Sequence, residues 1–332
     1  MTAAVDCPSC ADERAAGVAF CEACGQRLIP APAVAAPAPA PADGACPSCG
    51  TPGSIGADGY CGNCGMLAFR PRDHIEQQAG DAGAVTDRGL RHHRNEDAMW
   101  LAVRAGDDVD VVVCDGVSSS FDPDVASQTA VDRAGEHLAA LKAGDDLPQR
   151  IAEAITVAAT AVADLAKSGD PRRATSNPAC TIVAACVRGP EIGYAWVGDS
   201  RAYWLPAEGP PLPLTEDDSW ATHAIAAGID PQTAWNDPQA HAITAWLGAD
   251  AGTVTPRFGE FAVTAAGHLV LCSDGLWNYL TEPNEFADTV RSHLRKEGSA
   301  VAAARSLVAF ANAAGGADNI TVALIPVVPT AS

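Results

Sequence analysis

Apolar positions follow two patterns from about residue 81 to the C-terminus. Short apolar runs of strand length alternate with Ala-rich segments in which apolar residues recur at helical spacing. The first pattern predicts strands over residues 110–114, 181–187, 192–197, 268–272 and 320–325, and the second predicts helices over 124–143, 149–167, 285–295 and 299–314. Strand pairs beside helix pairs, without a regular strand–helix–strand alternation, indicate an α+β or mixed α/β architecture.

The first 80 residues carry a different pattern. They contain four Cys-x-x-Cys pairs in two similar copies, separated by a Pro/Ala-rich stretch. Closely spaced prolines favour an extended path, so residues 30–45 are predicted to be a spacer. The composition predicts five segments, namely a cysteine module over 1–29, the spacer, a second cysteine module over 46–67, a polar linker over 68–80 and a large domain over 81–328.

The cysteine spacing predicts metal binding. Two Cys-x-x-Cys knuckles about ten residues apart supply four thiolates, which suit one tetrahedral Zn²⁺. The pairing that fits the spacer places Cys7, Cys10, Cys21 and Cys24 on one ion and Cys46, Cys49, Cys61 and Cys64 on the other. A redox dithiol is the alternative, but such dithiols usually occur singly at the start of a helix, so two structural zinc ribbons are favoured.

The charge balance limits the partners. The chain has 332 residues with 21 Lys+Arg against 41 Asp+Glu, a net charge of −20, which disfavours general binding to nucleic acid or to an anionic membrane. The longest apolar runs are strand-sized and the N-terminus has no apolar signal region. We therefore expect a cytoplasmic protein with no nucleic-acid or membrane partner, whose zinc ribbons have a structural or protein-docking role.

Acidic residues recur where predicted strands end. Asp115 follows a Val-Val-Val-Cys run, Asp199 follows Ala-Trp-Val-Gly and Asp274 follows Leu-Val-Leu-Cys-Ser. Each has a rigid strand behind it and a tight turn in front, so several carboxylates can converge at one end of a sheet. Oxygen ligands without nearby His or Cys suit Mg²⁺ or Mn²⁺. The alternative is that these residues only end strands, since Asp and Asn favour turns.

Five motifs weigh against that alternative. In chain order they are Asp87-Arg88-Gly89-Leu90 with Asn95-Glu96-Asp97-Ala98, Asp115-Gly116, Val197-Gly198-Asp199-Ser200-Arg201, Ser273-Asp274-Gly275-Leu276-Trp277 and Ala317-Asp318-Asn319-Ile320-Thr321-Val322. Together they resemble the type 2C, metal-dependent protein serine/threonine phosphatases, and the resemblance extends from about residue 81 to 326. It implies an αββα sandwich, in which two antiparallel sheets pack face to face between helix pairs.

The resemblance also implies a site with two Mg²⁺ or Mn²⁺ ions. By similarity Asp115 bridges both ions, Asp274 and Asp318 complete one shell, and Glu96 and the Gly116 carbonyl serve the other ion. Asp199 with Asp274 matches a third, weaker site, Asp97 orients a water molecule, and Thr181 takes the place of a small hydroxyl residue near the site. A hydroxide between the two ions then attacks the phosphorus of a phosphorylated Ser/Thr protein in line.

Of the departures from the family pattern, one concerns the substrate phosphate and another the absence of a histidine general acid. His92 stands where the family has a phosphate-clamping Arg, so Arg91 or Arg94 would supply that charge or His92 would substitute weakly. Residues 117–120, Val-Ser-Ser-Ser, replace a Met or His followed by Gly-Gly. The candidate catalytic residues are therefore Asp97, Arg91, His92 and Arg94. We expect an active phosphatase, and the alternative is a catalytically silent, phosphatase-like binding module that uses the ribbons as a scaffold.

Overall fold

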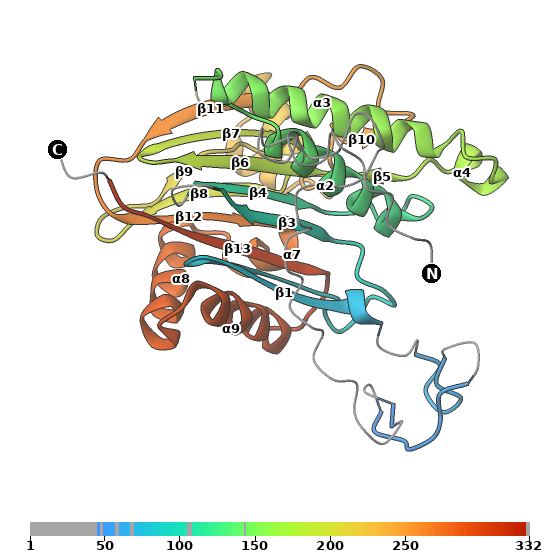
Figure 1. Ribbon diagram of the computed structural model, residues 1–332. Helices are drawn as coiled ribbons and strands as arrows, with labels where there is room; N and C mark the ends of the chain where they lie inside the picture. The colour runs from blue at the N-terminus through green and yellow to red at the C-terminus, as the bar shows by residue number, and fades with distance from the viewer. Residues whose placement is uncertain are drawn as a thin grey trace, which may run out of the picture.

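Two antiparallel sheets packed face to face form the centre of the structure (Figure 1). It is a computed structural model that describes residues 45–46, 49–56, 60–66, 70–104, 108–142 and 144–329. The six-stranded sheet has the order β1 (His74–Ala79), β2 (Ala82–Asp87), β13 (Ile320–Val327), β12 (Gly267–Cys272), β8 (Arg201–Pro206) and β9 (Leu212–Pro213). The five-stranded sheet has the order β11 (Arg257–Ala262), β7 (Glu191–Val197), β6 (Ile182–Arg188), β4 (Val109–Cys114) and β3 (Ala98–Val103). A short pair, β5 (Ala179–Cys180) and β10 (Leu247–Gly248), lies beside them.

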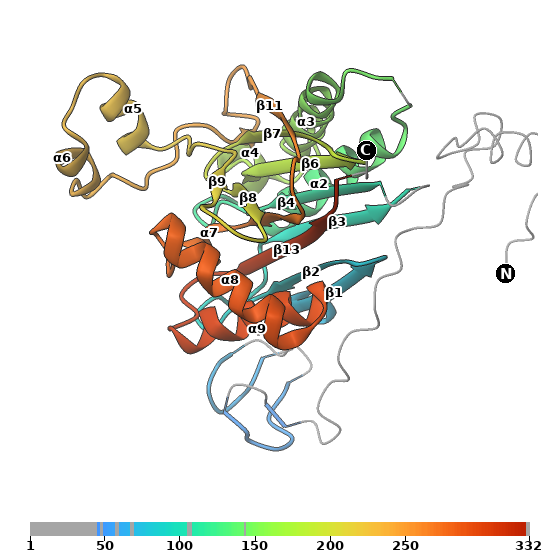
Figure 2. The same cartoon turned by 90° about the vertical axis from the view of Figure 1, so that its left-hand side faces the viewer.

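Helices cover the outer face of each sheet. The helices α2 (Pro123–Ala139) and α3 (Leu147–Leu165) pack on the five-stranded sheet, and α7 (Asp274–Trp277), α8 (Pro283–Glu297) and α9 (Ala300–Ala313) pack on the six-stranded sheet. The αββα sandwich expected from the resemblance is therefore confirmed. The remaining short helices are η1 (Pro71–Asp73), α4 (Pro171–Thr175), α5 (Trp220–Ala226) and α6 (Pro231–Trp235), and the last two project from the sandwich (Figure 2).

Local sequence signals set the helix ends. Asp146 accepts a hydrogen bond from the Gln149 N–H at the start of α3, and Ser299 accepts one from the Ala302 N–H at the start of α9. Such caps satisfy N–H groups that have no partner within the helix. Gly298 ends α8 with a φ of +71°, a left-handed conformation that glycine adopts without strain.

The central strands are apolar on both faces because each contacts two layers. Along β4, Val111 and Val113 belong to the core between the sheets, whereas Val112 packs under α2 and α3. Along β12, Leu271 points between the sheets while Val270 packs on the side of α8 and α9. A strand buried on both faces appears in the sequence as a continuous apolar run, which is the pattern that predicted these strands.

One predicted boundary differs from the structure. Residues 74–79, assigned from the sequence to a polar linker, form β1, which pairs with β2 from His74–Asp87 to Ala79–Ala82. The segment is polar because β1 is an edge strand, and edge strands commonly carry polar and charged side chains. Within the described part of the chain, no helix combines the length and apolar character needed to cross a membrane.

Candidate active site

The strand register brings the motif residues to one end of the sandwich. Cys114 at the end of β4 lies opposite Ala98 at the start of β3, so Asp115 and Asp97 emerge at the same end. Cys272 of β12 pairs with both Val322 of β13 and Arg201 of β8. The turns that carry Glu96, Asp97, Asp115, Asp199, Asp274 and Asp318 therefore share this end, as the sequence predicted.

Two glycines allow the acidic turns to approach each other closely. A Cβ atom at Gly275 would lie 1.9 Å from the carbonyl oxygen of Asn319, and a Cβ atom at Gly116 would lie 2.6 Å from the carbonyl oxygen of Glu96. Any larger residue at either position would push two backbone segments apart. The glycines beside the acidic residues are therefore needed for this packing.

Burial and mutual repulsion disfavour the charged forms of the clustered carboxyls. Burial raises the pKa of Asp115 well above its ordinary value, and the charges of Asp97 and Asp274 add to the shift. Burial likewise raises the pKa of Asp199 well above its ordinary value and that of Asp274 to about 6. Cations between the carboxylates would reverse these shifts, because an opposite charge favours the ionised form.

Unpaired oxygens in this cluster fit a divalent cation. Among the described residues, the buried Oδ1 atoms of Asp97 and Asp274 have no hydrogen-bond partner. Buried polar atoms without a partner are rare and costly, and hard cations such as Mg²⁺ and Mn²⁺ take carboxylate oxygens as ligands. The donor set is thus one that such ions can occupy.

Asp97 is held by two hydroxyl groups from the opposite sheet. Its Oδ2 accepts hydrogen bonds from Ser273 Oγ at 2.8 Å and from Thr321 Oγ1 at 2.7 Å. Burial raises the pKa of Asp97 to about 7, although these two hydrogen bonds lower it. The two bonds fix the carboxylate and leave Oδ1 for another partner.

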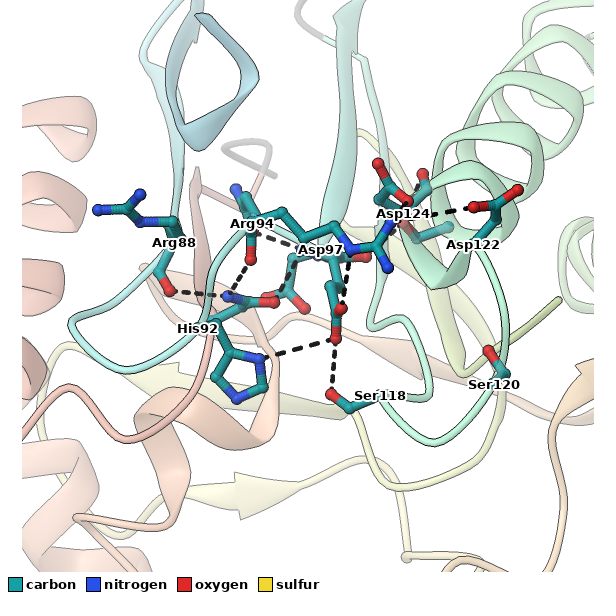
Figure 3. A network of polar contacts seen from close by, with 12 residues as sticks. Arg88, His92, Arg94, Asp97, Ser118, Ser120, Asp122 and Asp124 are labelled. Atoms are coloured by element: carbon teal, nitrogen blue, oxygen red, sulfur yellow. Dashed lines mark hydrogen bonds and ion pairs between the residues drawn. The ribbon is translucent and has the colours of Figure 1, made fainter. Parts of the chain in front are cut away.

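His92 lies between two of the predicted metal ligands, Glu96 and Asp318. Figure 3 shows His92 and Ser118 directed at the same carboxylate, that of Glu96. The Nε2 of His92 is 3.2 Å from Asp318 Oδ1, and its Nδ1 is 3.7 Å from Glu96 Oε2. The Glu96 carboxylate raises the pKa of His92 despite partial burial. Ser118 Oγ donates to the same Glu96 oxygen at 2.6 Å. Ser118 could not be predicted from the sequence, because no spacing rule indicates that its loop folds onto Glu96.

Arg94 is also directed toward this group, whereas Arg91 is not. Arg94 Nε donates to Glu96 Oε1 at 3.3 Å and Nη1 donates to Asp124 Oδ1 at 3.0 Å. Arg91 is exposed and makes no hydrogen bond or ion pair within the described part of the chain. Of the three cationic candidates, His92 and Arg94 therefore lie at the carboxylate cluster. Asp124, in the first turn of α2, was missed because an acidic residue at a helix start has an ordinary local explanation.

The second predicted cysteine set comes together in the structure. The sulfurs of Cys46, Cys49, Cys61 and Cys64 all lie within 4.8 Å of one another. The Thr51 hydroxyl, followed by Asn63, lowers the pKa of Cys49 to about 5, which favours the thiolate that binds zinc. Four thiolates in this arrangement fit a tetrahedral Zn²⁺. Cys7, Cys10, Cys21 and Cys24 lie outside the described residues, as do residues 30–44 of the predicted spacer.

The chain is similar to known proteins over both regions. The sequence model of the protein phosphatase 2C family matches residues 89–311, and that of the double zinc ribbon matches residues 7–65. The serine/threonine phosphatase stp of Listeria welshimeri is 31% identical over 252 residues, which cover 72% of this chain and 93% of that protein.

Solved structures share the fold. The serine/threonine phosphatase Stp1 of Staphylococcus aureus superimposes with a TM-score of 0.64 at 26% identity and covers 74% of this chain and 93% of that chain. The catalytic domain of the serine/threonine protein phosphatase PstP, solved with two manganese ions, superimposes with a TM-score of 0.59 at 26% identity and covers 74% of this chain and 97% of that chain. The family match extends over more than half of the sequence and includes three of the five acidic motifs completely. The chain therefore belongs to the protein phosphatase 2C family and carries a double zinc ribbon ahead of the phosphatase region.

Proposed function

We propose that this protein hydrolyses phosphoserine and phosphothreonine in proteins with the help of two Mg²⁺ or Mn²⁺ ions. The observation that carries the proposal is the convergence of Asp115, Asp199 and Asp274 at one end of the sandwich, with raised pKa values and an unpaired carboxylate oxygen on Asp274. A structural role does not explain such a cluster, because buried carboxylates that repel one another destabilise the fold unless cations offset them.

The proposed ligand set follows the motif positions. Asp115 would contact both ions, Asp274 and Asp318 would complete one shell, and Glu96 and the Gly116 carbonyl would serve the other. Asp199 together with Asp274 would hold a third, weaker ion. When bound, these ions supply an activated water and neutralise charge on the phosphoryl oxygens.

The chain's own side chains then position the reactants. Asp97, fixed through Oδ2 by Ser273 and Thr321, has its other oxygen available to orient a water molecule. His92 and Arg94 supply positive charge beside the cluster and would bind the substrate phosphate. A histidine gives one point contact where an arginine gives two parallel hydrogen bonds, so we expect weaker phosphate binding than a clamping arginine provides.

The zinc ribbons are proposed to dock a partner protein or the phosphoprotein substrate. Their cysteines would hold two structural Zn²⁺ ions, and the net charge of the chain disfavours a nucleic-acid partner. The alternative function is a silent phosphatase-like scaffold, which the substitution of His92 for the clamping arginine favours.

Hydrolysis of a phosphothreonine peptide with and without Mn²⁺ tests the proposal. We expect Mn²⁺-dependent phosphate release that falls on the order of 100-fold or more in Asp274→Ala, because a ligand to the activating ion is lost. Asp288→Ala is the matched control, since the Asp288 side chain is 80% exposed on α8 and its variant should keep full activity. Bound Mn²⁺ without turnover on a panel of peptides would refute the enzyme and support the scaffold.

A further inference from the structure

The segment Arg70–Asp73, which we call the strap, begins six residues after Cys64. It forms hydrogen bonds with Asn95, in the loop that carries Glu96 and Asp97. The Asp73 side chain is fully buried and accepts hydrogen bonds from the Arg70 backbone N–H at 2.8 Å and from its guanidinium at 3.1 and 3.2 Å. Asp73 Oδ1 also accepts from the Asn95 N–H at 3.2 Å, and the Arg72 carbonyl accepts from Asn95 Nδ2 at 3.2 Å. The strap therefore binds Asn95 through both its backbone and its side chain.

A continuous polar chain leads from Asn95 to Asp97. Asn95 Nδ2 donates to Thr86 Oγ1 at 2.9 Å, and Thr86 Oγ1 lies 2.7 Å from Thr321 Oγ1. Thr321 is the residue that donates to Asp97 Oδ2 at 2.7 Å. In addition, Asn95 Oδ1 accepts from the Asp97 N–H at 3.2 Å. Because these groups are buried, displacement of Asn95 would leave several of them without partners.

The strap also reaches Arg94 through a shared carboxylate, that of Asp124, which Figure 3 shows beside Arg94. Asp124 Oδ1 accepts from Arg94 Nη1 at 3.0 Å, and Asp124 Oδ2 accepts from Arg72 Nη1 at 3.5 Å. Arg72 Nη2 donates to the Asp124 carbonyl at 3.2 Å. Asp124 is buried, and Arg70 Nη1 also lies 3.9 Å from its Oδ2, so three arginines compensate its charge together. The strap thus contacts the supports of both Asp97 and Arg94.

We propose that the strap is a positioning element for the catalytic loop, with Asp73 as its central positioning residue. It joins the zinc-ribbon region to the phosphatase region in sequence and holds the Asn95–Asp97 loop in the geometry that catalysis uses. The proposal rests on the proposed function, because it assigns a support to Glu96, Asp97 and Arg94 in that reaction.

Asp73→Asn tests the role with little change in shape. The amide NH₂ would face the donors of Arg70 and Asn95, so at least one of these hydrogen bonds is lost and the loop shifts. We expect kcat on a phosphothreonine peptide to fall about tenfold, because small displacements of catalytic groups reduce rate strongly, while KM changes less than twofold. Arg70→Gln, which leaves Asp73 intact, should lower kcat less, and it remains informative if Asp73→Asn folds poorly.

Asp110→Asn is the matched control for burial and charge. Asp110 is also fully buried and pairs with two arginines, Arg104 at 3.5 Å and Arg188. It lies at the other end of β4, about 17 Å from Asp115 at 3.4 Å per residue. We expect Asp110→Asn to lower the melting temperature and keep kcat. The proposal would be overturned if folded Asp73→Asn kept the wild-type kcat, or if Asp110→Asn lowered kcat as much as Asp73→Asn does.

A second readout separates this proposal from the proposed function. Hydrogen exchange of the amides of residues 95–97, measured in the full chain, reports the loop without requiring turnover. If the wild type proves inactive, faster exchange in Asp73→Asn and not in Asp110→Asn still supports the strap as the support of this loop. Equal exchange in wild type and Asp73→Asn would refute it.

Discussion

The indole Nε1 of Trp277 donates a hydrogen bond to the backbone carbonyl of Asp199 at 3.0 Å. Trp277 follows Asp274 by three residues, so this bond ties the turn after β12 to the turn after β7. The ring is buried, and the Arg201 guanidinium lies over it at 3.6 Å from the ring centre. Because Asp199 and Asp274 are proposed to share a metal ion, Trp277 fixes the distance between the two turns that carry them.

Trp277→Phe should weaken the proposed shared metal site. The variant keeps an aromatic ring under Arg201 but leaves the Asp199 carbonyl without its donor. We expect the Mn²⁺ concentration for half-maximal activity to rise about 10-fold, as for other changes around metal ligands, and the free energy of unfolding to fall by about 1–3 kcal/mol. Mn²⁺ titrations of peptide hydrolysis and urea unfolding measure the two effects.

Trp246→Phe is the control for that experiment. Trp246 Nε1 donates to Asp250 Oδ1 at 3.0 Å in an exposed hydrogen bond, so its loss removes an indole hydrogen bond that involves none of the proposed metal ligands. We expect the free energy of unfolding to fall by less than about 0.5 kcal/mol and the Mn²⁺ concentration for half-maximal activity to stay unchanged. The same Mn²⁺ shift in both variants would contradict a role for the Trp277–Asp199 bond.

His92 variants should change substrate binding more than stability. In the proposed function His92 contributes the charge that meets the substrate phosphate, so His92→Ala should raise KM about 10-fold, a typical loss for one hydrogen bond to a charged group. His92→Arg should lower KM below that of the wild type, because guanidinium binds phosphate through two hydrogen bonds. Steady-state kinetics with a phosphothreonine peptide measures both.

The adjacent histidine provides the control. His93 is exposed, so His93→Ala changes the same stretch of chain without touching Glu96 or Asp318. We expect its KM to match the wild type. If His92→Ala also keeps the wild-type KM, phosphate binding depends on Arg94 or on the cations alone.

The central strands could be predicted from the sequence because burial on both faces requires a continuous run of apolar residues. The apolar runs at β4, β6, β12 and β13 lie between two layers, so nearly every position is apolar. By contrast, β11 alternates between partly buried and exposed residues and β1 is mostly polar, since each lies at a sheet edge. Edge strands have fewer contacts to satisfy, and their sequences are correspondingly less constrained.

In the candidate site, too, some residues could be predicted from the local sequence and others could not. Asp115, Asp199 and Asp274 directly follow apolar runs, so their convergence could be predicted from the sequence, while their roles as ligands remain predictions. Asp73 and Asp124 act through partners 22 and 30 residues away, Asn95 and Arg94 respectively. No local pattern records such contacts, because they depend on how the loops fold over the end of the sandwich.

Stability should depend on the charge of His74. Its Nδ1 lies 2.7 Å from Asp87 Oδ2 and its Nε2 lies 3.0 Å from Glu76 Oε1. The hydrogen bond with Asp87, followed by that with Glu76, raises the pKa of His74. Arg305 donates to both carboxylate oxygens of Glu76, and Asn312 donates to Asp87. The stabilisation is fully present below the unfolded pKa of about 6.5 and is lost as pH rises through the higher folded pKa.

Unfolding in urea at several pH values compares the wild type with His74→Gln. We expect the wild type to be more stable by about 1 kcal/mol at low pH and the difference to shrink above pH 6.5. His293→Gln is the control, because its stability difference from the wild type should change with pH in the opposite direction. Burial lowers the pKa of His293, so its neutral form stabilises the fold and this stabilisation is lost as pH falls. If the difference in unfolding free energy between the wild type and His74→Gln stays constant across this range, the ion pairs of His74 contribute no pH dependence.

Loss of one ribbon cysteine should remove one zinc ion from the purified full chain. Cys61 is buried, its Sγ lies 3.0 Å from Ser54 Oγ, and it belongs to the cluster with Cys46, Cys49 and Cys64. Cys61→Ala leaves three thiolates, too few to complete the closed four-ligand shell of a structural site. We expect elemental analysis to show one fewer zinc per chain than in the wild type. Cys272→Ala, at a buried cysteine of β12 that belongs to a different core cluster, should keep the wild-type zinc content. Equal zinc in Cys61→Ala and the wild type would place the metal elsewhere.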